Sequence, residues 1–318
     1  MNVRRPHISR IAIAAAAAVG LGTLSACSSD SSAAGNTDKF DVVASFYPME
    51  FLAERIGGDH VHVTTLTEPG QEPHDLDVSA QQRAQLEESD AALYLSGLQP
   101  AVDEAMQQAG TANKIDAAKL TELEDLGVED GHDHGGEEEG SAEEHALDPH
   151  VWLDPVKYAE IAEGVGKAFE KADPDHAADY RKNTAALVEE LGELNTSFAE
   201  GLKNTESKVF FTNHAAFGYL AERYGLTQEA ISGLDPESEP SPARIKELQE
   251  EAKADGVTTV FYETLVSDKT AKTLAADAGL RTDVLDPVEG ISDQSRGDDY
   301  IQVMQANLQA LQKALGSK

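Results

Sequence analysis

From residue 40 onward, the hydrophobic positions gather in short runs that alternate with amphipathic stretches. Six runs are rich in β-branched and aromatic residues: "DVVASF" (41–46), "VHVTTLT" (61–67), "AALYLSG" (91–97), "KVFFTN" (208–213), "VTTVFYE" (257–263) and "RTDVLD" (281–286). The stretches between them carry helix signals, such as the capping-box spacing of Ser79 and Gln82. This alternation of strands and helices predicts an α/β fold with mostly parallel sheets.

A long helical pattern interrupts the alternation between residues 155 and 205. One Asp-Pro step at 173–174 divides it, and the part from Pro174 onward predicts a helix of about 30 residues, roughly 45 Å long. Such a helix is too long for a crossover packed on one sheet. We therefore expect two (β/α) lobes joined by a long rigid backbone helix. The expected divisions are an N-terminal lobe over 40–154, a linking helix region over 155–205 and a C-terminal lobe over 206–318.

The first residues have the pattern of a processing segment. Three arginines precede an apolar run, "IAIAAAAAVGLGTL" (11–24), which is too short to cross a bilayer comfortably. The run leads into Leu24-Ser25-Ala26-Cys27, which resembles the lipobox of bacterial lipoproteins. An ordinary signal peptide with a chance cysteine is the alternative. The lipobox interpretation predicts a lipoprotein signal peptide over 1–26, a lipid on Cys27 and a flexible tether over 27–39.

Charge and cysteine content narrow the possible partners. The chain has 58 acidic and 25 basic residues, a net charge of -33, and such a surface repels nucleic acid and attracts cations. With 318 residues, 40% of them hydrophobic, the chain can form cores for two lobes. Cys27 is the only cysteine, so no disulfide can form within the chain.

One segment combines histidines with a run of acidic residues. The stretch "EDGHDHGGEEEGSAEEHA" (129–146) lacks apolar periodicity, which predicts a loop. It contains His132, His134 and His145, and we expect these three to form an auxiliary, weak metal-binding loop.

Three other histidines stand at comparable places in the pattern. His74 in "GQEPHDLDVS", His150 in "DPHVWLDP" and His214 in "FFTNHAAFGYL" each follow a β-rich run or a turn and precede a helix start. Asp286 in "DVLDPVEG" also follows a strand. Ligands of open α/β sheets collect outside the carboxyl ends of the strands, so these four side chains could converge on one cleft. Two of them lie on each side of the long helix, which predicts a site between the lobes.

Three imidazoles and one carboxylate suit a tetrahedral Zn²⁺ site, whereas Mn²⁺ would favour more oxygen ligands. Each histidine taken alone is more often a structural residue than a ligand, and the prediction depends on all three standing at matching strand ends. Glu263 also ends a strand and competes with Asp286 for the fourth position, as does water. Glu72 and Asp75 could accept a hydrogen bond from the His74 ring or lie in solvent.

The chain resembles the zinc/manganese solute-binding lipoproteins of bacterial ABC importers, in particular their zinc-uptake branch. The resemblance covers residues 40 to 315. It is carried by "VVASFYPMEFLAERIGGDHVHVTTL", "PGQEPHDLDVS", "DPHVWLDP", "FFTNHAAFGYLAERYGL", "EPSP" (239–242) and "VFYETLVSDKTAKTLA".

The resemblance implies two (β/α) lobes, a rigid connecting helix and a metal ion between the lobes. It places the first three ligands on His74, His150 and His214, and a histidine at the third position favours zinc over manganese. Asp286 matches the carboxylate type of fourth ligand. The resemblance makes Glu263 a structural hydrogen-bonding residue. The acidic loop is similar to the one found in zinc receptors.

These observations predict a monomeric receptor that captures Zn²⁺ outside the cytoplasm. It would be lipid-anchored on the extracytoplasmic face of the cell membrane and deliver zinc to an ABC permease with a cytoplasmic ATPase. A manganese-preferring receptor of the same family, a secreted zinc hydrolase and an adhesin are the alternatives. The chain has no HExxH motif, and a fourth protein ligand would close the water position that a hydrolase needs, so we expect no enzyme activity.

The lipobox interpretation predicts that Cys27→Ala releases the protein from the membrane fraction, because the lipid would be the attachment. Cell fractionation followed by detection of the protein in the membrane and soluble fractions measures this. Unchanged retention of the variant in the membrane fraction would refute the anchor.

Overall fold

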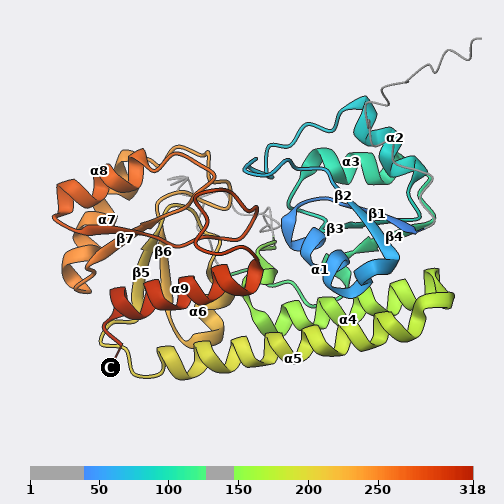
Figure 1. Cartoon of the computed structure of the whole chain (residues 1–318). Coiled ribbons are helices and arrows are strands. Elements are labelled where there is room, and N and C mark those ends of the chain that lie inside the picture. Colours follow the sequence, from blue (N-terminus) through green and yellow to red (C-terminus); the bar gives the residue numbers. More distant parts are fainter. Residues whose placement is uncertain (1–38, 127–146, 318) are drawn as a thin grey trace, which may run out of the picture. The chain divides into compact units, whose positions relative to one another are not determined.

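The β-rich runs of the sequence form two four-stranded parallel sheets. The computed structural model describes residues 39–126 and 147–317 (Figure 1). The expected signal peptide, Cys27 and the histidines of the acidic loop (His132, His134 and His145) lie outside the described residues.

The two sheets have the same topology. The first contains β1 (Phe40–Ala44), β2 (Val61–Thr65), β3 (Ala91–Tyr94) and β4 (Asn113–Asp116), in the order β2-β1-β3-β4. The second contains β5 (Val209–Thr212), β6 (Thr227–Ala230), β7 (Thr259–Tyr262) and β8 (Arg281–Val284), in the order β6-β5-β7-β8. All six strand pairs are parallel, with Val42 opposite Val63 and Ala91 in the first sheet and Val260 opposite Thr282 in the second. The predicted α/β class with parallel sheets is confirmed.

Helices accompany each sheet. The first sheet has α1 (Tyr47–Gly57), α2 (Ala80–Glu88) and α3 (Pro100–Gln108), and the second has α6 (Gly218–Tyr224), α7 (Pro242–Ala254), α8 (Lys269–Ala278) and α9 (Tyr300–Leu315). The predicted capping box begins α2: the Ser79 hydroxyl accepts from the Gln82 backbone N–H, and the Gln82 side chain accepts from the Ser79 N–H. Among the described residues, no helix is both long and apolar enough to cross a bilayer.

The linking region is a helical hairpin instead of one interrupted helix. Asp154 caps α4 (Pro155–Ala172) by accepting from the Val156 N–H, with Pro155 at the first helical position. The Asp-Pro step then reverses the chain through a short 3₁₀ turn, and α5 (Ala177–Leu202) runs back alongside α4 (Figure 1). Helix α5 packs on α1 beside the first sheet and on α9 beside the second. It therefore connects the two halves, as the predicted long helix should.

One large hydrophobic core is shared by both halves. It includes Phe46 beside the first sheet, Phe210 in the second sheet, and Trp152 and Tyr300 between them. The Phe46 and Trp152 rings meet edge to face at 5.1 Å, and the Tyr300 hydroxyl donates to the Trp152 carbonyl at 2.6 Å. Smaller clusters fill the space under α2 and α3 and under α7 and α8. The shared core fixes how the loops at the strand ends of one half face those of the other.

Candidate metal centre

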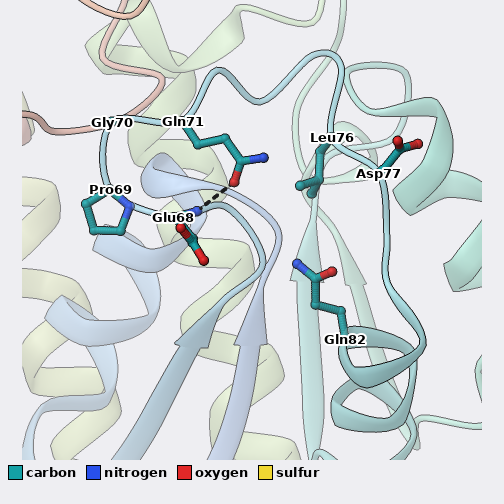
Figure 2. Close-up of a pocket in the computed structure, with 7 residues that line it drawn as sticks. All are labelled: Glu68, Pro69, Gly70, Gln71, Leu76, Asp77 and Gln82. Atoms are coloured by element: carbon teal, nitrogen blue, oxygen red, sulfur yellow. Dashed lines mark hydrogen bonds between the residues drawn. The ribbon is translucent and has the colours of Figure 1, made fainter.

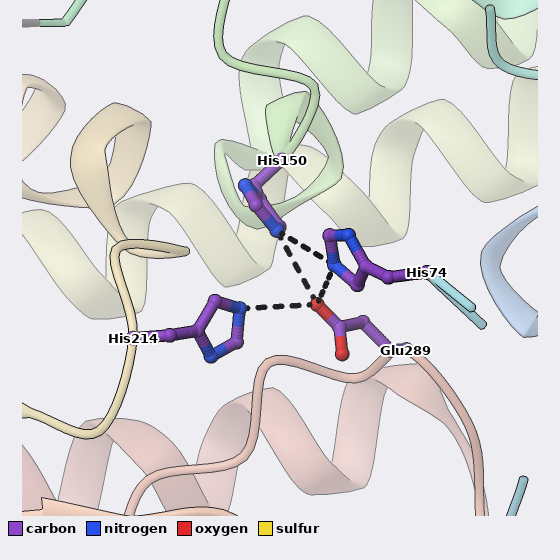
Figure 3. A group of neighbouring side chains, drawn as sticks. All are labelled: His74, His150, His214 and Glu289. Atoms are coloured by element: carbon purple, nitrogen blue, oxygen red, sulfur yellow. Dashed lines mark hydrogen bonds and ion pairs between the residues drawn. The ribbon is translucent and has the colours of Figure 1, made fainter. Parts of the chain in front are cut away.

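Four side chains from distant parts of the sequence meet between the two halves (Figure 3). His74 lies in the loop between β2 and α2, and His150 immediately precedes the 3₁₀ turn 151–153 that leads into α4. His214 follows β5, and Glu289 follows β8. Each half therefore contributes two of the four groups. The three predicted histidines are brought together, but the acid beside them is Glu289.

The carboxylate oxygen is nearly equidistant from the three ring nitrogens. Glu289 Oε1 lies 3.3 Å from Nε2 of His74, 3.3 Å from Nε2 of His150 and 3.4 Å from Nε2 of His214. The Nε2 atoms of His74 and His150 are 3.4 Å apart, and all four donor atoms lie within 4.8 Å of one another. Three nitrogens and one oxygen thus form a compact four-cornered cluster.

The size of this cluster matches a particular coordination chemistry. In a regular tetrahedron with such edges, the centre is about 2.0–2.1 Å from each corner, which is the usual length of Zn–N and Zn–O bonds. Imidazole nitrogens combined with a single carboxylate are ligands that suit Zn²⁺, and an octahedral oxygen-preferring ion would need further donors. The four atoms are therefore spaced for a tetrahedral zinc ion.

The cluster is buried on all sides except one. His150, His214 and Glu289 are almost completely buried, whereas the His74 side chain is 10% exposed. A surface pocket of about 530 Å³ lies along the loop that carries His74 and is lined by Glu68, Pro69, Gly70, Gln71, Leu76, Asp77 and Gln82 (Figure 2). None of the four converging side chains lines this pocket. The loop with His74 is thus the side of the cluster nearest to solvent.

Two buried carboxylates orient the histidine rings. Asp148 Oδ1 lies 2.8 Å from His150 Nδ1 and accepts from the His150 backbone N–H at 2.9 Å. Glu263 Oε1 lies 2.8 Å from His214 Nδ1 and accepts from the Asn213 side chain at 2.9 Å. A carboxylate on Nδ1 favours a proton there and leaves Nε2 free to bind a metal. The structural hydrogen-bonding role predicted for Glu263 is confirmed.

The acids beside His74 have a different role. Glu72 accepts from the backbone N–H groups of His74 at 3.0 Å and Asp75 at 3.3 Å, so it shapes the loop. The Asp75 residue is exposed. Glu72 therefore holds the backbone at His74, and the carboxylate that faces the His74 ring is Glu289.

The same carboxylates shift the pKa values of the cluster. Burial alone would lower the pKa of His150, but the hydrogen bond and charge of Asp148 outweigh it and raise that pKa. Burial would also lower the pKa of His214, but Glu263 and Glu289 outweigh it and raise that pKa well above its ordinary value. Burial would raise the pKa of Glu289, yet hydrogen bonds to the three imidazoles hold it well below the usual range. The cluster therefore keeps a negative charge at its centre.

The expectation that Asp286 is the fourth group is corrected by the geometry. Asp286 does not belong to the group of converging donor atoms. Its Oδ1 accepts from the Val288 N–H at 2.8 Å, and its Oδ2 accepts from the hydroxyls of Thr264 at 3.1 Å and Ser295 at 3.3 Å. Burial raises its pKa to about 6. Both carboxylate oxygens of Asp286 thus accept hydrogen bonds from groups outside the cluster of converging donor atoms.

Sequence reasoning missed Glu289 although it lies three residues further on. The placement after strand β8 indicates the correct turn but not which of its two acids faces the cleft. Between the two acids lies Val288, whose backbone has a positive φ of 58°. Such a backbone conformation is rare for a β-branched residue, and nothing in the local sequence signals it.

Trp152 joins the segment that carries His150 to the turn that carries Glu289. Its indole N–H donates to the Pro287 carbonyl at 2.8 Å, and the whole side chain is buried. The hydrogen bond adds a direct link between groups contributed by the two halves.

Two similar α/β halves with a buried cluster of three imidazoles and one carboxylate define a two-lobed metal-binding protein. The model of the zinc-uptake complex component A family, described as periplasmic, matches residues 42–314. The chain therefore belongs to this family.

Individual relatives support the same assignment. The chain is 37% identical over 295 residues to the zinc-binding lipoprotein AdcA of Streptococcus pneumoniae, a match that covers 91% of this chain and 58% of that protein. It is 35% identical over 312 residues to the high-affinity zinc uptake system protein ZnuA of Bacillus subtilis, with 93% and 97% covered. The crystal structure of the Zn(II)-bound ZnuA-like domain of the pneumococcal AdcA superposes with a TM-score of 0.72 at 34% identity, covering 87% of this chain and 99% of that one. The chain thus spans a little over half the length of AdcA and nearly all of the Bacillus protein.

The contact between Asp148 and His150 leads to a prediction. Asp148→Asn removes the charge that supports the His150 ring, and losing such an outer partner typically weakens metal affinity about 10- to 100-fold. Asp179→Asn is the matched control, because Asp179 lies 3.0 Å from Nε2 of His60, another histidine–carboxylate pair that is not part of the cluster. Competition with a zinc chelator measures both variants. Equal affinity in Asp148→Asn and the parent would contradict the role assigned to Asp148.

Proposed function

We propose that the protein is an extracytoplasmic Zn²⁺ receptor, with His74, His150, His214 and Glu289 as the four ligands. The observation that carries the proposal is the cluster of three Nε2 atoms and one carboxylate oxygen, in which the oxygen lies 3.3–3.4 Å from each nitrogen and all four atoms lie within 4.8 Å of one another. Membership of a zinc-uptake family supports it. The ion is the cargo, held until it is transferred to a membrane permease.

The geometry favours zinc over manganese and binding over catalysis. Three imidazoles and one carboxylate complete a tetrahedron, whereas Mn²⁺ prefers a larger shell with more oxygen donors. A zinc hydrolase keeps one coordination position for water, but here a fourth protein group occupies that corner. The protein is therefore a binding protein and not an enzyme.

The family and the N-terminal sequence support a proposal for the partner and the location. The family is that of a component of a zinc-uptake complex, and one relative is named a lipoprotein. The receptor works as a monomer, anchored by a lipid on Cys27 at the outer face of the cell membrane. It delivers zinc to an ABC permease driven by a cytoplasmic ATPase. The acidic loop with His132, His134 and His145 binds zinc weakly, in addition to the main site.

Metal titration of the purified protein tests the proposed function. We expect one tight Zn²⁺ site per chain, with Mn²⁺ a much poorer competitor. His150→Ala should weaken zinc binding by more than the roughly 100-fold upper cost of losing an outer partner, because it removes a direct ligand. His62→Ala is the matched control, since His62 is a half-buried histidine on the edge strand β2 and lies outside the cluster.

Several results would overturn the proposal. They are a parent that binds no zinc, one that binds Mn²⁺ as tightly as Zn²⁺, and a His150→Ala variant that retains parental affinity. Growth of the source cells under zinc limitation separates a receptor from an adhesin, because only a receptor makes that growth depend on the gene.

The raised pKa values of His150 and His214 predict the pH dependence of zinc binding. Zinc binds neutral imidazole, so protons compete with zinc wherever the histidines of the zinc-free protein are protonated. An unperturbed histidine titrates near pH 6.5, and both pKa values here are raised above that. Affinity should therefore already be falling at about pH 6.5, and decline more steeply in more acidic buffer. Chelator competition across a pH series measures it, and a flat profile down to about pH 5 would contradict the three-histidine site.

A further inference from the structure

The turn between β8 and Glu289 has an unusual backbone. Val288 has a φ of 58° and is completely buried, although a β-branched residue strongly disfavours the left-handed region. Strained conformations of this kind persist only where surrounding interactions over-determine them, and they collect at ligand-binding sites. The interactions that keep Val288 at this φ therefore also bear on the position of the adjacent Glu289.

Asp286 supplies the central interaction of the turn. Its Oδ1 accepts from the Val288 N–H at 2.8 Å, which closes a tight loop of two residues on the strained peptide. Asn307 holds Asp286 itself, accepting from its N–H at 2.9 Å and donating to its carbonyl at 2.6 Å. Trp152 holds the intervening Pro287 carbonyl from the other half of the molecule. The backbone of the turn is thus held by hydrogen bonds at each of its three residues, Asp286, Pro287 and Val288.

Glu289 needs a firmly held backbone because its carboxylate has few hydrogen-bond partners of its own. Its carboxylate is buried, and Oε2 has no hydrogen-bond partner among the described residues. Within the described part of the chain, the ion pairs of Oε1 are with the three imidazoles that would share the metal. A glutamate has three rotatable side-chain bonds, so its carboxylate reaches one point reproducibly only if its Cα is placed firmly and its surroundings are packed. The backbone of the turn places the Cα of Glu289.

We propose that Asp286 is a positioning residue for zinc binding, which keeps Val288 in its left-handed conformation and thereby directs Glu289 into the cluster. This rests on the proposed zinc-binding function. In this proposal Asp286 does not coordinate the zinc ion. It accepts a hydrogen bond from the Val288 N–H and so positions the Glu289 side chain. Without Asp286, Val288 relaxes toward an ordinary φ and the Glu289 carboxylate moves off the shared corner.

Two substitutions at Asp286 separate positioning from coordination. Asn keeps an oxygen that can accept from the Val288 N–H, whereas Ala keeps none. We expect Asp286→Ala to weaken zinc binding about tenfold, which corresponds to about 1.4 kcal/mol, and Asp286→Asn to stay within about threefold of the parent. If Asp286 acted through its charge or as a ligand, Asn would be nearly as harmful as Ala, and that result would overturn the proposal.

A double-mutant cycle with Glu289→Ala tests whether the effect passes through Glu289. Residues that act through one another are not additive, so Asp286→Ala should cost no further zinc affinity once Glu289 is Ala. If Asp286 had only a general structural role, Asp286→Ala would reduce zinc affinity by the same factor whether residue 289 is Glu or Ala. Its thermal stability could fall as well. Equal losses in both backgrounds would refute the positioning role. If Asp286→Ala fails to fold, the near-isosteric Thr264→Val, which removes one donor to Asp286 Oδ2, replaces it in the cycle with a smaller expected loss.

The strain at Val288 can be measured separately. In the zinc-free protein, Val288→Gly and Val288→Ala both lose side-chain packing, but only glycine adopts a positive φ without cost. The glycine variant should therefore unfold at higher urea concentration than the alanine variant, the reverse of the order at an ordinary position. The opposite order would show that the left-handed turn is not strained and would overturn that part of the proposal.

Failure of this proposal is distinguishable from failure of the proposed function. A parent that binds no zinc overturns the receptor function and the positioning role together. A parent that binds zinc, with Glu289→Ala weakened and Asp286→Ala unchanged, overturns the positioning role alone.

Discussion

The structure is organised around one buried carboxylate oxygen that faces three imidazole nitrogens. Glu289 Oε1 lies 3.3–3.4 Å from all three Nε2 atoms, and its carboxylate is otherwise cut off from solvent. A charge in such a place is tolerated only because the imidazoles supply hydrogen bonds and can carry protons in the absence of metal. The four groups come from four separate loops, so the arrangement requires that both sheets and the helices between them hold those loops in register.

Rigid elements behind the loops provide that register. The shared core around Trp152 and Tyr300 fixes the two halves against each other, and α5 packs along both. Behind the rings, Asp148 and Glu263 set the orientation of His150 and His214, while Asp286 and Asn307 set the turn that carries Glu289. One oxygen of each of these carboxylates thus engages a ring nitrogen or the backbone, whereas Asp148 Oδ2 and Glu263 Oε2 have no hydrogen-bond partner among the described residues. Several acids are buried in this small region because each one orients a histidine ring or the backbone of a turn.

The elements that the sequence failed to indicate share a physical cause. Strands β4 ("NKID") and β6 ("TQEA") are edge strands, so each pairs with only one neighbour and need not be apolar. Their residues therefore give no hydrophobic signal. The six strands that were predicted include the apolar central strands β1, β3, β5 and β7, which neighbours cover on both sides. The hairpin of α4 and α5 was indicated by its Asp-Pro step, but only packing shows that the two helices lie side by side.

By itself, the sequence determined the α/β class, the connecting helix and the three histidines. Hydrophobic periodicity, capping residues and the Asp-Pro-His and Asn-His segments are local properties, and strand ends in a parallel sheet collect ligands wherever the sheet is built. Tertiary structure alone decided which acid joins the histidines. Asp286 and Glu289 lie in one turn with the same sequence signal, and between them Val288 has a positive φ. The turn is held by Trp152, which donates to the Pro287 carbonyl, and by Asn307, which bonds to the Asp286 backbone; these two residues are 136 and 19 residues from Val288 along the chain and reach the turn only after folding.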